Sequence, residues 1–346
     1  MKILIISPKS RGIGGVASHV SELASLLKKR GYEVRVLSSE NSPIIPLRKM
    51  KNLSFALFSA LKLEILSEKY DIAHAHNMPS ILPLRVSKAE TKILTLHGVY
   101  SKQIAFLHGK TFGQIAKHIE RRGLLWINGL TAVSKVVKNY YESLGLKVEY
   151  IPNAINVHKL PKDKIKLYDI QVVYIGRLSK EKGVDILIKA FNRIKTDAHL
   201  LIIGKGYLEN YLRKLAKNNE KIHFLGYLEH EKALKVIAGS DLLVLPSLYE
   251  GLSSVILEAM ALKVPVLVSD IEENRELVKH NITGLLFPKG SIRGLSKALE
   301  EALLNLNNLK KIADNAYNLV MKEYLWDVVV EKYIKFYEKL SVAENL

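Results

Sequence analysis

Short apolar runs alternate along the chain with segments that are apolar at helical spacing. In the first half the runs are KILIIS (2–7), YEVRVLSS (32–39), DIAHAHN (71–77) and TKILTLHG (91–98). Between the first two lies a segment with an apolar residue every three or four positions: Val16, Val20, Leu23, Leu26 and Leu27. That spacing is typical of a helix with one buried face. The alternation predicts a doubly wound parallel sheet, whose ligands bind at the carboxyl ends of the strands.

A second series of the same kind follows residues 151–164, a proline- and lysine-bearing stretch that is typical of a linker. Its apolar runs are IQVVYIGRLS (170–179), AHLLIIGKG (198–206), KIHFLGY (221–227), DLLVLPS (241–247) and VPVLVSD (264–270). The closing segment is apolar at Leu325, Val328, Val329, Tyr333 and Phe336, which predicts an amphipathic helix. We therefore expect α/β domains over 1–158 and 159–324, facing each other across a cleft lined by strand ends, and a helix within 325–346.

The composition is that of a globular protein. The 346 residues are 48% hydrophobic with a mean hydropathy of +0.06, enough for two packed cores. No apolar run approaches the roughly 18 residues of a membrane span. The N-terminal MKILIISPKS lacks the cleavage site and apolar length of a signal peptide, so we expect a cytoplasmic protein. Cysteine is absent, which excludes disulfides, thiolate chemistry and zinc fingers.

The net charge of +18 is unevenly distributed. Residues 1–158 hold 23 Lys and Arg against 10 Asp and Glu, whereas the remainder holds 29 against 24. The N-terminal part is therefore the basic one. Such an imbalance suits an anionic partner, whether nucleic acid, acidic lipid or a phosphorylated substrate.

The strongest candidate chemistry lies in PSLYEGLSSVILEAMA (246–261), which has the pattern of a strand end, a glycine-bearing loop and a helix. Gly251 lets a ligand approach the backbone closely, and the N–H groups of 252–255 point out of the helix N-terminus, where phosphate is favoured. Glu250 precedes this terminus and Glu258 lies about two turns inside it, among unusually apolar neighbours. A ligand touching both could carry a diphosphate between two hydroxyl-bearing ends, as a nucleotide sugar does. The alternative is that Glu250 only stabilises the helix dipole and Glu258 is solvated.

Two cations occupy the same expected sheet edge. Arg177 and Lys182 lie in GRLSKEKGVD (176–185), which follows a strand and precedes a helix. Arg binds phosphate oxygens bidentately and Lys acts as a point charge, so together they could stabilise a departing nucleoside diphosphate. The alternative is that both are solvated surface charges.

Three histidines end two of the predicted strands. His97 lies at a carboxyl edge, where ligands bind, although a histidine there can also be an ordinary buried one. His74 and His76 alternate along one strand and so share a face, which would permit shared metal coordination. No third ligand is indicated and DxD is absent, so we predict no metal site.

The glycine cluster RGIGGVAS (11–18) also suggests a dinucleotide site at first sight. Its glycines follow G-x-G-G rather than G-x-G-x-x-G. Although the acid Glu40 follows the second strand, this spacing disfavours a hydride-transferring Rossmann enzyme.

Taken together, these segments resemble the retaining glycosyltransferases of the GT-B fold, specifically the large group often called family 4. The resemblance covers nearly the whole chain, and so many motifs in the same order are highly specific. The motifs are GGVASHV (14–20), HAHN (74–77), TLHG (95–98), AVS (132–134), IPNAINV (151–157), GRLSKEKG (176–183), IIGKG (202–206), FLGYL (224–228), PSLYEGLSSVILEAMA (246–261) and NITGLLF (281–287).

The resemblance implies a role for each candidate residue. Arg177 and Lys182 would hold the donor diphosphate, with Gly14 and Gly15 close to the phosphates. Glu258 would bind the ribose hydroxyls, and Glu250 the hydroxyls of the transferred sugar. His97 would meet that sugar near its reacting face. The backbone around Gly251, Leu252 and Ser253 would complete these contacts, and that around Gly204, Gly226 and Tyr227 would select the base.

The resemblance also implies a mechanism and a final helix that crosses back to the first domain. The acceptor attacks an oxocarbenium-like sugar on the face that the leaving phosphate occupies, and that phosphate takes the acceptor proton. No general base and no metal are then needed, because Arg177, Lys182 and the helix dipole stabilise the charge. The linker motif departs from the family pattern at Ala154 and Asn156, where Gly and Asp are usual, which concerns the hinge more than the chemistry.

The donor is expected to be a UDP- or GDP-linked hexose, and the acceptor a glycan or a lipid-linked hydroxyl compound. Residues 45–69 combine Arg48, Lys49 and Lys51 with an apolar series, and 101–122 add cations near Phe106 and Phe112. Both stretches suit an anionic membrane surface on the inner face of the membrane, although 53–66 could equally be a core-packing helix.

Two alternatives remain at this point. A GT-B epimerase would isomerise a nucleotide sugar without transferring it. A basic nucleic-acid-binding protein would explain the charge but not Glu250, Glu258 and the glycine loops, and the chain has no zinc, RRM or basic-zipper pattern. We therefore expect no nucleic-acid partner.

Overall fold

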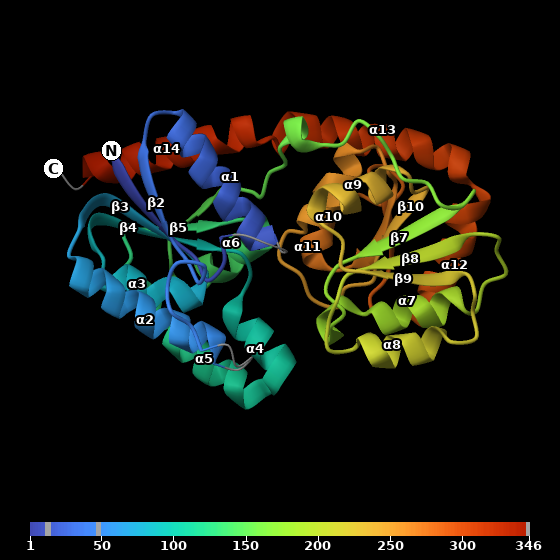
Figure 1. Ribbon diagram of the computed structural model, residues 1–346, viewed down its shortest axis with the longest axis horizontal. Coiled ribbons are helices and arrows are strands. Elements are labelled where there is room, and N and C mark those ends of the chain that lie inside the picture. Colours follow the sequence, from blue (N-terminus) through green and yellow to red (C-terminus); the bar gives the residue numbers. More distant parts are fainter. Residues whose placement is uncertain (11–14, 46–49, 344–346) are drawn as a thin grey trace. The chain divides into compact units, whose positions relative to one another are not determined.

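The computed structural model describes residues 1–10, 15–45 and 50–343. The chain divides into two compact units (Figure 1). Unit 1 comprises Met1–Ala154 and Trp326–Leu346, and unit 2 comprises Ile155–Leu325. The chain thus passes from one unit to the other after Ala154 and after Leu325, beside the boundaries of 158/159 and 324/325 that the sequence suggests.

Unit 1 is built on a six-stranded parallel sheet in the order β2-β1-β3-β4-β5-β6. Its strands are β1 (Lys2–Ile6), β2 (Glu33–Leu37), β3 (Lys69–His76), β4 (Lys88–Leu96), β5 (Gly129–Ala132) and β6 (Val148–Tyr150). β1 lies between β2 and β3, with Ile5 opposite Val36 of β2 and His74 of β3. The sequence pattern predicted the first four strands and missed the last two, because GLTA and VEY are too short to form an apolar run.

Helices cover both faces of this sheet (Figure 1). α1 (Gly15–Lys29) and α14 (Trp326–Ala343) lie on one face, where Val20, Leu23 and Val329 pack with Ile3 and Ile5. The opposite face buries apolar side chains such as Phe55, Leu84 and Leu124. The helices there are α2 (Lys51–Leu66), α3 (Ile81–Val86), α5 (Lys110–Leu124) and α6 (Lys135–Glu142), with α4 (Tyr100–His108) packed on α5 and a 3-10 turn at Met78–Ser80.

The last helix belongs to unit 1, although its buried face differs in part from the expected one. Val329, Tyr333 and Phe336 are buried as predicted, whereas Val328 is 39% exposed and Leu325 precedes the helix. The buried stripe instead includes Trp326, Val330, Ile334 and Tyr337. The prediction started the apolar stripe from the wrong residues, because several apolar side chains adjoin one another in WDVVV.

Unit 2 repeats the doubly wound plan with a six-stranded parallel sheet in the order β12-β11-β10-β7-β8-β9. Its strands are β7 (Gln171–Ile175), β8 (His199–Ile203), β9 (Ile222–Gly226), β10 (Leu242–Leu245), β11 (Val266–Asp270) and β12 (Leu285–Pro288). The first five were predicted. The edge strand β12 was not, because its LLFP is only half buried and follows no long apolar run.

The helices of unit 2 pack in two groups (Figure 1). α7 (Val184–Phe191) packs on α8 (Glu209–Ala216) and α12 (Ile292–Leu304). α10 (Ser254–Ala261) packs on α9 (His230–Ala238) and α13 (Leu306–Glu323). α11 (Glu272–Arg275) follows β11, and 3-10 turns span Val157–Lys159 and Lys180–Lys182. The predicted fold class, two doubly wound parallel-sheet domains, is confirmed.

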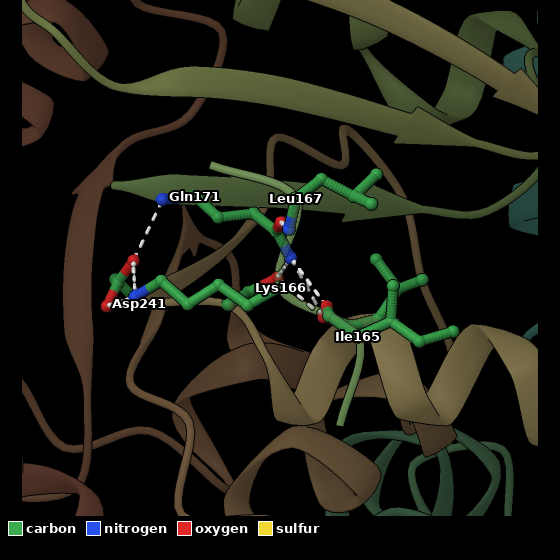
Figure 2. A network of polar contacts seen from close by, with 7 residues as sticks. Ile165, Lys166, Leu167, Gln171 and Asp241 are labelled. Carbon is green, nitrogen blue, oxygen red and sulfur yellow. Dashed lines mark hydrogen bonds and ion pairs between the residues drawn. The ribbon is translucent and has the colours of Figure 1, made fainter. Parts of the chain in front are cut away.

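The buried side-chain amide of Gln171 stabilises the segment that leads into β7 (Figure 2). The Gln171 side chain accepts from Leu167 N–H at 2.9 Å and donates to the carbonyl of Ile165 at 3.3 Å. Asp241 accepts from Gln171 N–H at 2.8 Å and pairs with Lys166 Nζ at 3.0 Å. This network lies at the amino end of β7, away from the carboxyl edge where the candidate residues gather, so its role is structural.

None of the helices in the described part of the chain has the length and hydrophobicity needed to cross a membrane.

Candidate functional site

Two loops meet at the carboxyl edge of the unit 2 sheet, one after β7 and one after β10. Leu248 N–H donates to the carbonyl of Glu181 at 2.8 Å. Gly183 has a φ of +61°, and a Cβ there would lie 2.3 Å from the carbonyl oxygen of Pro246. Only glycine permits this approach, which brings the predicted cations into range of the predicted carboxylates.

Lys182 and Glu250 form an ion pair across these loops. The Lys182 Nζ lies 2.5 Å from Glu250 Oε1, and the same oxygen accepts from the Ser247 hydroxyl at 2.8 Å. The two charged side chains are only 19% and 10% exposed, so the pair is shielded from solvent. The structure therefore brings together two of the residues that the sequence singled out, and Lys182 is not a solvated surface charge.

A buried polar chain behind this pair was missed by the sequence analysis. The Ser269 hydroxyl donates to the carbonyl of Ser247 at 2.5 Å, and the Asn274 amide donates to the carbonyl of Ser269 at 2.8 Å. All three side chains are buried. They fix the loop that carries Glu250 to the end of β11 and to α11. Small polar residues after the apolar runs were the only signal in the sequence.

α10 begins where the 246–261 motif predicted a helix terminus. Ser253 is its N-cap residue and makes no side-chain capping bond, so the N-terminal N–H groups are not capped in that way. Glu258 lies one turn inside α10 and not two as expected, because the helix begins only at Ser254. Its side chain is 12% exposed and lies 2.9 Å from the Nε2 of His230 on α9. The alternative of a solvated Glu258 is wrong, and His230 is a partner that the sequence did not indicate.

Arg177 lies on the same loop as Lys182 but does not join the pair with Glu250. Its guanidinium is 3.3 Å from Glu181, and its side chain is 65% exposed. Arg177 is therefore the more accessible of the two cations, and the alternative of a solvated surface charge holds for its side chain.

Glycines draw the ends of β7, β8 and β9 together. Gly204 has a φ of +137°, and a Cβ there would lie 1.9 Å from the carbonyl oxygen of Gly176. Its N–H donates to the Gly226 carbonyl at 2.7 Å. Gly226 itself has a φ of +67°, and the adjacent Tyr227 is 43% exposed. This edge presents backbone and the exposed ring of Tyr227, which suits a planar ligand.

Unit 1 carries a different feature, a cluster of four imidazoles from His19, His74, His76 and His97. The ring centroids of His19 lie 5.4 Å from His76 and 4.9 Å from His97, and the His76 and His97 centroids are 5.3 Å apart. His74 and His76 share a face of β3 as predicted, with ring centroids 4.4 Å apart. His97 alone of the four is partly exposed.

Hydrogen bonds hold these rings in place. His19 contacts Asn153 at 3.0 Å and the Tyr333 hydroxyl at 3.1 Å. His74 contacts the Tyr337 hydroxyl at 2.7 Å and Thr95 at 2.6 Å. The tyrosines come from α14, so the last helix completes the polar core of unit 1.

Burial keeps all four imidazoles neutral. It lowers the pKa of His19 to about 4 and that of His74 to about 3. Burial, with the neighbouring imidazoles, holds the pKa of His76 and of His97 well below the usual value. His97 is therefore a neutral hydrogen-bonding group at neutral pH and not a cation.

The cluster bears on the metal question. His19, His76 and His97 each offer one nitrogen within 4.8 Å of the others, so the statement that no third ligand is indicated was wrong. The sequence analysis considered His74 and His76 as shared metal ligands. That pairing was also wrong, because both ring nitrogens of His74 are hydrogen-bonded. Both nitrogens of His19 are hydrogen-bonded as well, and we interpret the cluster as a hydrogen-bond network.

The backbone around His97 is fixed by an unusual residue. Asn77 has a φ of +64°, which few residues other than glycine adopt. Its N–H donates to the carbonyl of Thr95 at 3.0 Å, and its side-chain oxygen accepts from His97 N–H at 3.2 Å. Of the predicted glycines, Gly15 begins α1, and Gly14 lies outside the described residues.

Comparisons with known proteins agree with this fold. The family model "Glycosyltransferase Family 4" matches residues 13–159, and "Glycosyl transferases group 1" matches 158–319. The phosphatidyl-myo-inositol mannosyltransferase of Mycobacterium leprae is 28% identical over 99% of this chain and 98% of its own.

Among solved structures, sucrose-phosphate synthase from Thermosynechococcus elongatus has a TM-score of 0.83 at 19% identity, over 99% of both chains. Anabaena HepE, determined in complex with UDP and glucose, has a TM-score of 0.76 at 18% identity, over 98% of this chain and 100% of its own.

The fold is thus GT-B. The chain belongs to the group 1 glycosyltransferases, family 4, and is a transferase enzyme. This membership decides against the nucleic-acid-binding alternative.

Proposed function

We propose that this glycosyltransferase moves a hexose from a UDP- or GDP-linked donor to a hydroxyl acceptor, with retention and without a metal. The observation that carries the proposal is the shielded Lys182–Glu250 pair at the N-terminus of α10. A cation and a helix N-terminus favour a diphosphate, and a carboxylate favours sugar hydroxyls. The complex of HepE with UDP and glucose supports this class of donor.

The roles follow the chemistry of each group. Lys182 and the accessible Arg177 hold the diphosphate, and Gly15 approaches the phosphates. Glu258 accepts from the ribose hydroxyls, displacing His230 from that oxygen. Glu250 accepts from the transferred sugar.

The other proposed contacts come from backbone groups, from the edge that selects the base and from His97 of unit 1. Backbone around Gly251, Leu252 and Ser253 completes the contacts to sugar and phosphate. The glycine edge with Tyr227 selects the base. His97 provides a neutral hydrogen-bonding group to the donor sugar.

No described side chain is required as a general base in this proposal. The leaving phosphate, held by Lys182 and Arg177, accepts the proton of the acceptor hydroxyl as the new bond forms on the same face of the sugar. The cations stabilise the charge that develops on the diphosphate, so chelation by EDTA should leave the rate unchanged.

Nucleoside diphosphate release from a panel of UDP-, GDP- and ADP-sugars tests the proposal, with and without a lipid extract from the source cells. We expect release from one donor, stimulated by an acceptor and abolished in Glu250→Ala. Glu300→Ala, an exposed acid on α12, is the matched control. Isomerised donor without transfer would instead identify an epimerase, and absence of both activities and of nucleotide binding would overturn the proposal.

We further propose a lipid-linked acceptor reached at an anionic membrane surface, on the inner face of the membrane. The mannosyltransferase relative, named for a phosphatidyl-inositol acceptor, supports a lipid-linked substrate. On α5, Phe112, Ile115 and Ile119 are 54–61% exposed and lie along one side of the helix. The acid of α5, Glu120, is fully buried and bonded by the Tyr141 hydroxyl, and burial raises the pKa of Glu120.

The exposed charges of α5 are therefore all positive: Lys110, Lys117, Arg121 and Arg122. On the same face of the sheet, α2 buries Phe55 and Leu63 but exposes Leu53, Leu57 and Leu61 by about half, so α2 both packs on the core and presents an apolar stripe. Arg48 and Lys49 lie outside the described residues. Apolar side chains flanked by cations suit an interfacial helix, at about 1 kcal/mol for each cation near acidic lipid.

Sedimentation with vesicles of phosphatidylcholine containing phosphatidylglycerol tests this surface. Lys117→Glu with Arg121→Glu should release the protein from the vesicles. Lys335→Glu with Lys339→Glu, exposed on α14 over the opposite face of the sheet, should not. A parent protein that does not sediment would exclude the membrane surface without affecting the transferase.

A further inference from the structure

The contact between His76 and His97 raises a question about proton placement. His76 Nδ1 lies 3.1 Å from His97 Nε2. Both imidazoles are neutral, so each has one N–H and one lone pair, and one of the two facing nitrogens must be the donor. If His76 donates, the Nδ1 of His97 carries the proton and is a donor. If His97 donates, its Nδ1 carries a lone pair and is an acceptor.

The buried environment of His76 distinguishes the directions. The His76 side chain is fully buried, and its Nε2 has no hydrogen-bond partner among the described residues. If His97 donated, His76 would carry its proton on Nε2 and bury an N–H with no acceptor, which is a rare and costly arrangement. If His76 Nδ1–H donates, its Nε2 buries only a lone pair, which is the less costly state.

The same reasoning defines the neighbouring ring. The His19 Nδ1 faces the side-chain oxygen of Asn153, an acceptor, so Nδ1 carries the His19 proton. The His19 Nε2 lone pair then accepts from the Tyr333 hydroxyl. Both hydrogen bonds of His19 are consistent with their partners. His19 therefore has no second N–H that could donate to His76.

We propose that His76 is a positioning residue that holds His97 in its Nδ1–H tautomer, so that the partly exposed side of His97 is a hydrogen-bond donor to an oxygen of the sugar substrate. The His97 Nδ1 has no partner among the described residues, and the backbone of His97 is fixed by Asn77. The tautomer is a property of unit 1 by itself. Its use in donor binding rests on the proposed function.

Nitrogen-15 NMR of protein labelled at histidine tests the tautomer directly, without any substrate. The assignments come from the spectrum of His97→Gln, which lacks the ring in question. In the parent protein His97 should show a protonated Nδ1 and a non-protonated Nε2. The reverse assignment would overturn the proposal whatever the activity of the enzyme.

Two variants of His76 test the consequence for binding. In His76→Asn the amide nitrogen takes about the place of Nδ1 and can still donate, whereas His76→Leu fills the space without a donor. We expect His76→Leu to leave the Nε2 of His97 without a donor, so that no hydrogen bond from His76 fixes the tautomer or the orientation of the ring. It should lower kcat/KM for the donor by about tenfold, equivalent to about 1.4 kcal/mol, and His76→Asn should restore most of the loss.

A double variant shows whether His76 acts through His97. His97→Ala and His97→Ala with His76→Leu should have the same kcat/KM, because the second change removes nothing further. Additive losses would mean that His76 acts otherwise and would overturn the positioning role. If His76→Leu does not fold, the comparison of His76→Asn with the parent and the parent NMR spectrum still decide the tautomer.

The two levels of the argument fail separately. A correct tautomer with an unchanged kcat/KM in His76→Leu would overturn the substrate contact of His97 and leave the transferase proposal standing. An inactive parent protein would contradict the proposed function, while the NMR measurement would still test the tautomer.

Discussion

The ion pair between Lys182 and Glu250 makes nucleotide binding and turnover respond in opposite directions to one substitution. Glu250→Gln removes the negative charge and keeps an oxygen that can accept from Ser247 and from a sugar hydroxyl. Lys182 then loses the anion that holds it at 2.5 Å. The diphosphate no longer competes with Glu250 for this cation.

The size of the effect follows from the burial of the pair. Both side chains are less than a fifth exposed, so screening by solvent is small. A hydrogen bond to a charged group contributes about 1.5–3 kcal/mol, and a diphosphate must replace part of it. We expect Glu250→Gln to bind UDP or GDP up to about tenfold more tightly, about 1.4 kcal/mol, while kcat/KM for the donor sugar falls about 10- to 100-fold.

Lys182→Met should behave differently. It removes the cation from the diphosphate and leaves Glu250 buried without a countercharge, so nucleotide affinity should fall about 10- to 100-fold. Lys189→Met is the matched control, since Lys189 pairs with Asp185 on α7 at 3.0 Å and takes no part in the loop contacts. It should leave nucleotide affinity unchanged.

Isothermal titration calorimetry with UDP and with GDP, beside steady-state transfer assays, measures both quantities. The reasoning is refuted if Glu250→Gln weakens nucleotide binding as much as Lys182→Met does. That result would mean that Glu250 holds Lys182 in the binding geometry instead of competing for it.

Three further predictions concern stability. Gln171→Leu removes the side-chain donor to the Ile165 carbonyl and the acceptor of Leu167 N–H. It should lower the free energy of unfolding by about 1–3 kcal/mol in urea titrations, with no change in donor KM; an unchanged midpoint would contradict the structural role of the network. Gly204→Ala places a Cβ against backbone and should abolish soluble expression, whereas Gly226→Ala, with open space around it, should cost about 1–2 kcal/mol; equal effects would refute the packing argument. The folded pKa of His19 (about 4) and of His74 (about 3) lie below the usual 6.5, so their contribution is complete above pH 6.5 and lost as pH falls toward 4. Each histidine should lower the free energy of unfolding by up to about 1.4 kcal/mol per pH unit in this range. Calorimetric melting temperatures that do not fall between pH 6.5 and 5 would exclude this contribution.

The sequence by itself determined the architecture, and it located the strand, loop and helix that carry the candidate residues of unit 2. Apolar runs long enough to cross a sheet gave nine of the twelve strands, because a strand buried on both faces must be apolar throughout. The strand, glycine loop and helix around Glu250 were recognisable because the backbone conformation there depends on local residues. The short strands β5, β6 and β12 have no apolar run long enough to be recognised. They form because neighbouring strands in the sheet pair with them.

Only the tertiary structure decided which groups touch. Lys182 and Glu250 are 68 positions apart, and their pairing depends on Gly183 packing against Pro246. His19, His76 and His97 come from three elements, and Tyr333 reaches them from the far end of the chain. Sequence patterns report which residues are buried and at what period, but the direction of a hydrogen bond or an ion pair depends on neighbours that only the folded chain brings together.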